Sequence, residues 1–191
     1  MSLTTLEHPR AKVASRRAGI RADAPAKINL TLEVLGRRDD GYHELRSLVI
    51  GVDLADHVRC RTSPVPGITL DCNDPALNNG DNLAVRAART LAHRCGRESA
   101  LRIDLQKRIP AGSGLGGGSS DAATTLRLCN DLWETGLDEG GLAAVGAELG
   151  SDVPLFFSLP SAVIEGRGER VSPVRLRWSG WVLLLCPPVP V

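Results

Sequence analysis

The residues best suited to chemistry in this chain form a glycine-rich run, in which five of the seven residues 112–118 are glycine. Ser119 and Ser120 follow directly. Glycine reaches positive φ at little cost, so such a loop can turn its amides inward. If the next helix begins here, its free N–H groups and the positive end of its dipole face the same space. Because phosphate binds well at such a place, we expect a phosphate-bearing ligand, most simply a nucleotide.

Three familiar glycine motifs do not fit this run. The spacing over residues 112–117 matches the dinucleotide fingerprint, but Asp131, near the position of its acid, lies in a helical pattern with no intervening strand. A Walker A loop needs a lysine that residues 117–119 lack, and the protein-kinase loop needs a Val-Ala-x-Lys strand that the sequence lacks. A structural glycine turn that joins a strand to a helix stays open as the alternative. Ser119 and Ser120 could also be N-caps of the helix, a role that is compatible with phosphate binding.

Two alternating segments must position this loop and its partners. Over residues 24–34, apolar residues alternate with polar ones, which predicts a half-buried strand with Lys27 and Asn29 on its polar face. Residues 101–109 alternate again and lead into the loop. Lys107 falls in their apolar register, where its ammonium group needs an anion or a polar opening.

The remaining elements follow from periodicity and end signals. Residues 45–60, 68–72, 162–165 and 181–186 are expected to be strands, with a turn at Asp40-Gly41. Helices are expected from a cap at Asp81 or Asn82 to Gly96, from the glycine loop through Trp133, and over residues 138–149. The sequence has no repeat or low-complexity linker, so we expect one mixed α+β domain.

The composition excludes several classes of partner. With 23 Lys and Arg against 22 Asp and Glu, the chain lacks a basic field for nucleic acid or an anionic membrane. No segment approaches the roughly 20 apolar residues that a membrane helix needs. Five cysteines without metal-binding spacing favour a reducing cytoplasm. We therefore expect a cytoplasmic protein with a small-molecule partner, and leave a homodimer open.

Three segments together resemble the GHMP kinases: residues 24–45, 108–124 and 150–157. The patterns PAK-N-L and DGYHEL are the specific signals, because the glycine loop is shared across that superfamily. The resemblance runs from about Arg21 to the end of the chain. It implies the N-terminal domain of that family, an α+β fold described as a ribosomal protein S5 domain 2-like two-layer sandwich.

The resemblance also implies ATP-dependent phosphorylation of the 2-hydroxyl of a cytidine-diphosphate-linked methylerythritol, in non-mevalonate isoprenoid synthesis. By motif it assigns Lys27 and Asp152 as the catalytic pair, Asn29 and His43 as substrate contacts, Tyr42 as a platform for the cytosine, Asn82 beside the adenine, and Lys107 on the nucleotide side. It places ATP, accompanied by Mg²⁺, on the loop residues Pro110, Ala111, Gly112, Ser113, Gly114, Leu115, Gly116, Gly117, Gly118, Ser119 and Ser120. Whether the protein itself ligates the metal stays open.

The chemistry of phosphoryl transfer is consistent with these roles, since it needs charge neutralisation and in-line positioning. A carboxylate at Asp152 could accept the hydroxyl proton, and Lys27 would keep that carboxylate ionised. Each residue also has a structural interpretation: a solvated lysine, a capping aspartate, a core Tyr42 and a surface His43. The three segments together favour the functional interpretation.

The domain prediction divides the chain into a disordered leader at residues 1–18, with a transit peptide as the alternative, and an ATP-binding domain at residues 19–191. Family members are longer and carry a C-terminal domain with a third glycine motif. We expect this chain, either a fragment or a natural truncation, to lack that domain and to show weak or absent activity alone. The alternatives are another GHMP kinase, acting on mevalonate, homoserine or a sugar, and a catalytically silent nucleotide-binding module.

Overall fold

The longest element of the fold is strand β3 (His43–Thr62), which carries two strands on each of its edges. A computed structural model describes residues 19–37, 41, 43–98, 100–177 and 179–185. Strands β1 (Ile20–Asn29) and β2 (Glu33–Arg37) pair antiparallel with one edge of β3. Strands β5 (Ala100–Gln106) and β6 (Ser161–Gly166) pair antiparallel with the other. Adding β4 (Gly67–Cys72), parallel to β5, and β7 (Arg170–Pro173), antiparallel to β6, makes a mixed seven-stranded sheet in the described chain.

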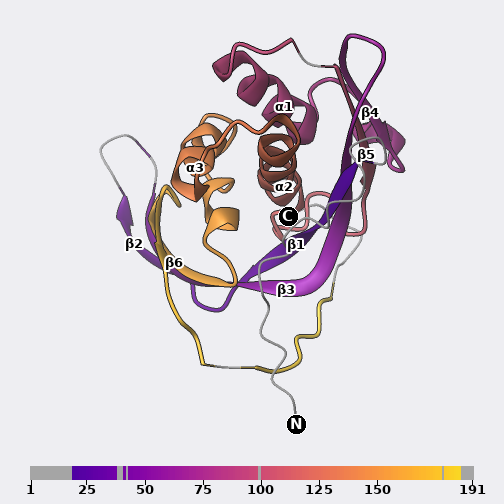
Figure 1. The fold of residues 1–191 in the computed structure, drawn as a ribbon. Helices are drawn as coiled ribbons and strands as arrows, with labels where there is room; N and C mark the ends of the chain where they lie inside the picture. Colours follow the sequence, from indigo (N-terminus) through magenta and orange to yellow (C-terminus); the bar gives the residue numbers. More distant parts are fainter. Residues whose placement is uncertain (1–18, 38–40, 42, 99, 178, 186–191) are drawn as a thin grey trace.

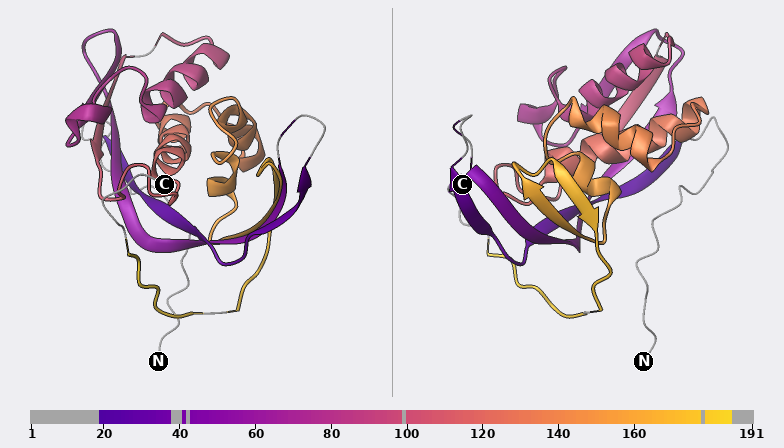
Figure 2. Two further views of the ribbon diagram at one scale, coloured as in Figure 1. Left: turned by 180° about the vertical axis from the view of Figure 1, so that it is seen from behind. Right: turned by 90° about the vertical axis from the view of Figure 1, so that its left-hand side faces the viewer.

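The helices cover one side of this sheet. Helices α1 (Leu83–Arg94), α2 (Gly117–Trp133) and α3 (Glu139–Ala147) lie on its concave side (Figure 1). Two 3₁₀ turns, η1 (Pro75–Leu77) and η2 (Pro154–Phe157), accompany them. The view from behind and the side view show the same two layers (Figure 2). The predicted α+β two-layer sandwich is thus confirmed.

The core lies between the two layers. Small residues on α1 let it approach α2 closely, and Ala84, Ala87 and Ala88 are fully buried there. The sheet contributes Val58 and Ile103 from its concave face, both fully buried. Each large apolar side chain buried in this way stabilises the fold by about 1.5–3 kcal/mol.

The helix ends follow the predicted signals. Asn82, rather than Asp81, caps α1 by accepting a hydrogen bond from the Ala84 amide at 2.9 Å. Gly96 takes φ +60° just past the end of α1, which suits a glycine. Asp138 caps α3 by accepting from the Gly141 amide at 2.8 Å.

The expected strand over residues 24–34 is interrupted. It divides into β1 and β2, because the chain bends at residues 30–32, where Thr31 Oγ1 accepts a hydrogen bond from the Leu48 amide at 3.0 Å. β2 lies at the end of the sheet, away from α1 and α2 (Figure 1). Leu32 and Val34 are therefore 60% and 61% exposed, and the prediction that they continue the buried face is wrong.

Two other expectations near the C-terminal end also differ. Residues 181–185 form no strand, and Trp181, Leu183 and Leu185 are exposed; Cys186 lies outside the described residues. Residues 174–177 and 179–185 lie beneath the sheet, on the side away from the helices (Figures 1 and 2). The short strand β7 was not predicted, because its sequence RVSP shows no alternation that marks a strand.

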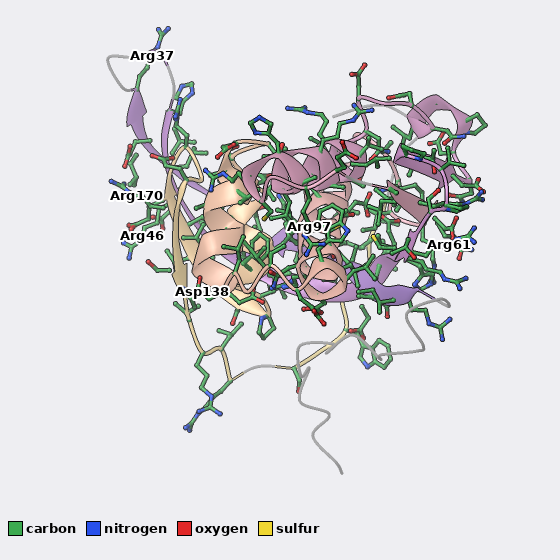
Figure 3. All side chains as sticks on the ribbon, turned by 45° about the horizontal axis from the view of Figure 1, so that its top comes forward. Arg37, Arg46, Arg61, Arg97, Asp138 and Arg170 are labelled. Carbon is green, nitrogen blue, oxygen red and sulfur yellow. The ribbon has the colours of Figure 1, made fainter. Side chains whose placement is uncertain are left out.

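Charged side chains cover the outside of the molecule (Figure 3). Arg46 and Arg170 lie near one end of the sheet, where Arg170 pairs with Glu44 at 2.5 Å, and Arg61 lies at the opposite end.

The four described cysteines are free thiols. In the part of the chain that the structure describes, no helix is long and apolar enough to cross a membrane.

Candidate active site

The glycine loop joins β5 to α2 through three left-handed residues. The angle φ is +67° at Gly112, +72° at Gly114 and +73° at Gly116, while Ser113 and Leu115 between them keep negative φ. Such alternation turns successive amides toward one concave side, an arrangement that binds anions. Side chains other than glycine rarely adopt this φ, so the glycines are required by the path of the loop.

The amides of this loop are free for a ligand. Within the described chain, the amides of residues 114–119 donate no hydrogen bond. Helix α2 begins at Gly117 with Gly116 as its N-cap, so the prediction of Ser119 and Ser120 as N-caps is wrong. Free amides at the positive end of a 17-residue helix form an anion site without further help.

The exit of the loop is attached to Lys27 on β1. The Lys27 amide donates to the carbonyl of Leu115 at 2.9 Å. A Cβ built on Gly116 would lie 3.1 Å from Lys27 Cγ and 2.8 Å from Phe156 Cζ. The Lys27 stem and the Phe156 ring therefore lie directly against the loop and leave no room for a side chain at Gly116.

Lys27 and Asn29 share one face of β1, as predicted. Lys27 Nζ donates to Asn29 Oδ1 at 2.9 Å, and Asn29 Nδ2 donates to Ser47 Oγ at 2.6 Å. Ser47, fully buried on β3, in turn donates to the Thr31 carbonyl. This chain of hydrogen bonds fixes where the Lys27 ammonium group sits beside the loop.

Asp152 lies on the segment that carries Phe156 to the loop. Its Oδ1 is 3.6 Å from a Cβ built on Gly168, in the turn between β6 and β7. The structure shows no ion pair between the described side chains of Lys27 and Asp152. Phe156, which is four residues after Asp152 in the sequence, lies against Gly116 of the loop.

His43 lies exposed at the start of β3 and lines a hollow of about 310 Å³ with Val34, Leu45 and Arg167. Arg167 precedes Gly168, the residue against which Asp152 lies. The predicted substrate contact and the predicted base therefore approach the same β6–β7 turn. The predicted cytosine platform, Tyr42, lies outside the described residues.

Of the two predicted surroundings of Lys107, an anion or a polar opening, the structure shows anions. Its Nζ donates to Asp56 on β3 and, at 2.7 Å, to Asp121 on α2. The Lys107 side chain is 9% exposed, and those of Asp56 and Asp121 are 0% and 3% exposed. The ammonium group thus lies beneath the loop, paired with two carboxylates, and a direct contact with nucleotide stays a prediction.

Within this cluster, Asp121 differs from an ordinary surface acid. Burial raises the pKa of Asp121 from 3.8 to about 7, although the nearby Lys107 ammonium group opposes the shift. The Asp121 atom Oδ1 is buried without a hydrogen-bond partner. The two partners raise the pKa of Lys107, against the effect of its own burial.

Asn82 has a structural role that sequence reasoning gave to it or to Asp81. Besides accepting from Ala84, its Nδ2 donates to the Leu77 carbonyl at 2.9 Å. A Cβ built on Gly118 would lie 3.5 Å from Leu83 Cδ1, so the beginnings of α1 and α2 adjoin. Asn82 is therefore near the loop, and its predicted contact with adenine stays a prediction.

Sequence reasoning missed four residues of this site: Asp56, Asp121, Phe156 and Ser47. An acid within the apolar strand pattern at Asp56 was a usable signal, since a buried carboxylate needs a partner. Asp121 follows the two serines and was hidden in the helical pattern. Among the described residues, no group of three acidic, cysteine or histidine side chains could hold a metal ion.

Comparison with known proteins agrees with this arrangement. The family model described as the N-terminal domain of GHMP kinases matches residues 82–158, which include α1, β5, the loop and the segment of Asp152. The chain contains a GHMP kinase N-terminal domain. The family resemblance noted from the sequence is thereby confirmed.

Relatives of this GHMP domain include curated enzymes named 4-diphosphocytidyl-2-C-methyl-D-erythritol kinase. The one from Geobacter sp. (strain M21) is 44% identical over 169 residues, which cover 88% of this chain and 60% of that protein. The one from Pseudomonas aeruginosa (strain PAO1) is 45% identical over 166 residues, covering 87% of this chain and 58% of that protein. The chain spans about 60% of the length of these relatives.

Solved structures give the same result for the fold. A crystal structure of 4-(cytidine 5'-diphospho)-2C-methyl-D-erythritol kinase matches with a TM-score of 0.71 at 42% identity, over 82% of this chain and 55% of that one. The mevalonate kinase of Methanococcus jannaschii matches with a TM-score of 0.65 at 16% identity, over 82% and 56% of the two chains. At that identity the second match shows the fold alone.

Proposed function

We propose that this chain binds ATP at the glycine loop and phosphorylates the 2-hydroxyl of 4-diphosphocytidyl-2-C-methyl-D-erythritol. One observation carries the proposal: the amides of residues 114–119 are free and adjoin the Lys27 side chain. The choice of acceptor is supported by relatives of that name at 44–45% identity. Other GHMP kinases share the fold at much lower identity.

The loop suits a triphosphate because it offers several donors without side chains in the way. No atom lies within 4 Å of a Cβ built on Gly112 or Gly114, so the loop is open there. Amides that are already oriented need no reorganisation when charge shifts during transfer. Mg²⁺ would arrive with ATP and neutralise phosphate charge, held through the phosphates.

Lys27 and Asp152 act on the acceptor hydroxyl. Asp152 accepts its proton as the bond to phosphorus forms, and the Lys27 ammonium group stabilises the oxygen as it loses that proton. Asn29 holds Lys27 in place through the 2.9 Å hydrogen bond. His43, at the hollow beside Arg167, contacts the cytidine-linked part of the substrate, together with Tyr42.

A single-turnover assay tests this proposal, with the protein in excess so that slow transfer is visible. The wild-type chain should release ADP only when the cytidylated substrate is present. Asp152→Asn should lower the rate by about 10²–10⁴-fold, the usual contribution of a general base, with little change in ATP affinity. Asp71→Asn, on the exposed end of β4, is the matched control and should behave as wild type.

Two results would contradict the proposal in different ways. If the wild-type chain binds ATP but releases no ADP in response to the substrate, it is a nucleotide-binding module without kinase activity. If it does not bind ATP, the loop has another function.

A further inference from the structure

A buried ion-pair cluster of Asp56, Lys107 and Asp121 lies beneath the glycine loop. Its members come from β3, from the residue just past β5, and from α2, so the cluster joins the sheet to the helix layer. Buried ion pairs are seldom more stabilising than apolar residues of the same volume, because the charges lose their hydration. Stability alone is therefore a weak reason for this cluster.

Asp56 fixes the point where the chain enters the loop. Its Oδ1 accepts hydrogen bonds from the amides of Arg108 and, at 2.8 Å, Ile109, and its Oδ2 accepts from Lys107 Nζ. The Asn73 side chain holds the main chain of Lys107 from the other direction, accepting from its amide at 2.6 Å and donating to its carbonyl at 3.1 Å. Three consecutive residues are thus held immediately before Pro110.

Lys107 and Asp121 fix the other end of the loop. Asp121 is in the first turns of α2, and its hydrogen bond to Lys107 ties the start of the helix to the entry of the loop. A Cβ built on Gly117 would lie 3.2 Å from Lys107 Nζ, so the ammonium group lies against the first helical residue. The unpaired amides of residues 114–119 therefore lie between these two attached points.

We propose that Asp56, Lys107 and Asp121 are positioning residues that hold the loop entry and the start of α2 in the relative placement at which the loop amides converge on a phosphate. The ligand in this proposal rests on the proposed function. The other part of the proposal, that the cluster sets the shape of the loop, also applies to the chain without a ligand.

The test replaces the linking charges together. In Lys107→Met/Asp121→Leu the ammonium group and one carboxylate are both removed, so no uncompensated pair of acids is left and Asp56 keeps its two amide donors. Leu128→Ala is the control, because Leu128 is buried on the same helix, away from the loop, and its truncation destabilises the fold without touching the cluster. All three proteins are compared at a temperature where each is folded, using inorganic tripolyphosphate as the calorimetric probe and amide NMR shifts of residues 112–120 without ligand.

The double variant should bind tripolyphosphate about 10- to 100-fold more weakly, by analogy with the loss of the residues that orient the ligands of a metal site, and its loop amide shifts should move. Leu128→Ala should keep the wild-type affinity and shifts. Unchanged shifts and affinity in the double variant would overturn the proposal while leaving the proposed function intact. If the wild type binds no tripolyphosphate or ATP, the proposed function fails, and the ligand-free shifts alone decide whether the cluster positions the loop.

Discussion

At the residue scale, Gly116 shows most clearly why this loop needs glycine. It combines φ +73° with contacts that a Cβ would make at 2.8 Å to Phe156 Cζ and 3.1 Å to Lys27 Cγ. Gly112 and Gly114 have similar angles with open space around them. Gly116 is therefore the position where the path of the loop and the placement of Lys27 depend on each other.

We expect Gly116→Ala to destabilise the chain more than an alanine substitution at a glycine that has positive φ but open space around its Cβ position. The left-handed conformation costs about 1–2 kcal/mol, and the displaced Phe156 and Lys27 side chains add about 1–3 kcal/mol. Gly96→Ala is the control, with φ +60° and nothing within 4 Å of its Cβ. Urea unfolding measures both; equal losses for the two variants would show that the contacts at Gly116 are unimportant.

The pH dependence of stability reports on Asp121. Its pKa is raised from 3.8 to about 7 by burial, so the folded chain keeps a proton that the unfolded chain releases near pH 4. This contribution to stability is complete below pH 4 and is lost as the pH rises through 7. Asp121→Asn removes the titration. The melting temperature of the variant should therefore rise relative to that of the wild type between pH 4 and 7, by roughly 8–16 °C. A constant difference across this range would mean that Asp121 is ionised throughout.

At the element scale, the sequence predicted those features that depend on neighbouring residues alone. The five glycines before an amphipathic segment predicted the loop and α2, and Asn82 and Gly96 marked the ends of α1. Lys107 in an apolar register predicted either an anion or a polar opening beside it. The register could not identify Asp56 as the anion, because Asp56 is 51 residues away in the sequence. The interruption of the first strand at residues 30–32 could not be predicted, since the hydrogen bond that accompanies it joins Thr31 to Leu48, 17 residues away in the sequence.

The cap of α1 offers a test at this scale. Asn82→Ala should destabilise the chain by about 1 kcal/mol, because the Ala84 amide loses its acceptor. Asn82→Asp keeps an acceptor oxygen there and should retain most of the stability in the same thermal melts. If both variants lose the same amount, the donor to the Leu77 carbonyl, and not the cap, is the stabilising group.

At the scale of the whole molecule, periodicity gave the fold class and most strands, while exposure near the C-terminal end followed only from the structure. Residues 181–185 read as a strand because they are apolar, yet Leu183 and Leu185 are 84% and 83% exposed. Leu184 between them packs against the small cluster of Ala26, Ile109 and Leu115, under the loop. Because the three leucines are consecutive and identical in type, the sequence does not indicate which of them is buried.

Exposed apolar side chains of this size favour association. We expect Leu183→Ser/Leu185→Ser to reduce self-association and dye binding by the purified chain, measured by light scattering and by the fluorescence of a hydrophobic probe, with the melting temperature unchanged. Leu184→Ser should do the opposite, lowering the melting temperature because it disturbs the packing beneath the loop. If the double variant associates as strongly as the wild type, the surface responsible for self-association lies elsewhere on the molecule.

The most direct test of the account is a crystal structure of the chain with a non-hydrolysable ATP analogue. We predict that amides from residues 114–119 lie about 2.7–3.2 Å from the phosphate oxygens, with Lys27 and Asp152 on either side of the terminal phosphate. Phosphates bound away from these amides, or Lys27 and Asp152 far from the terminal phosphate, would contradict it.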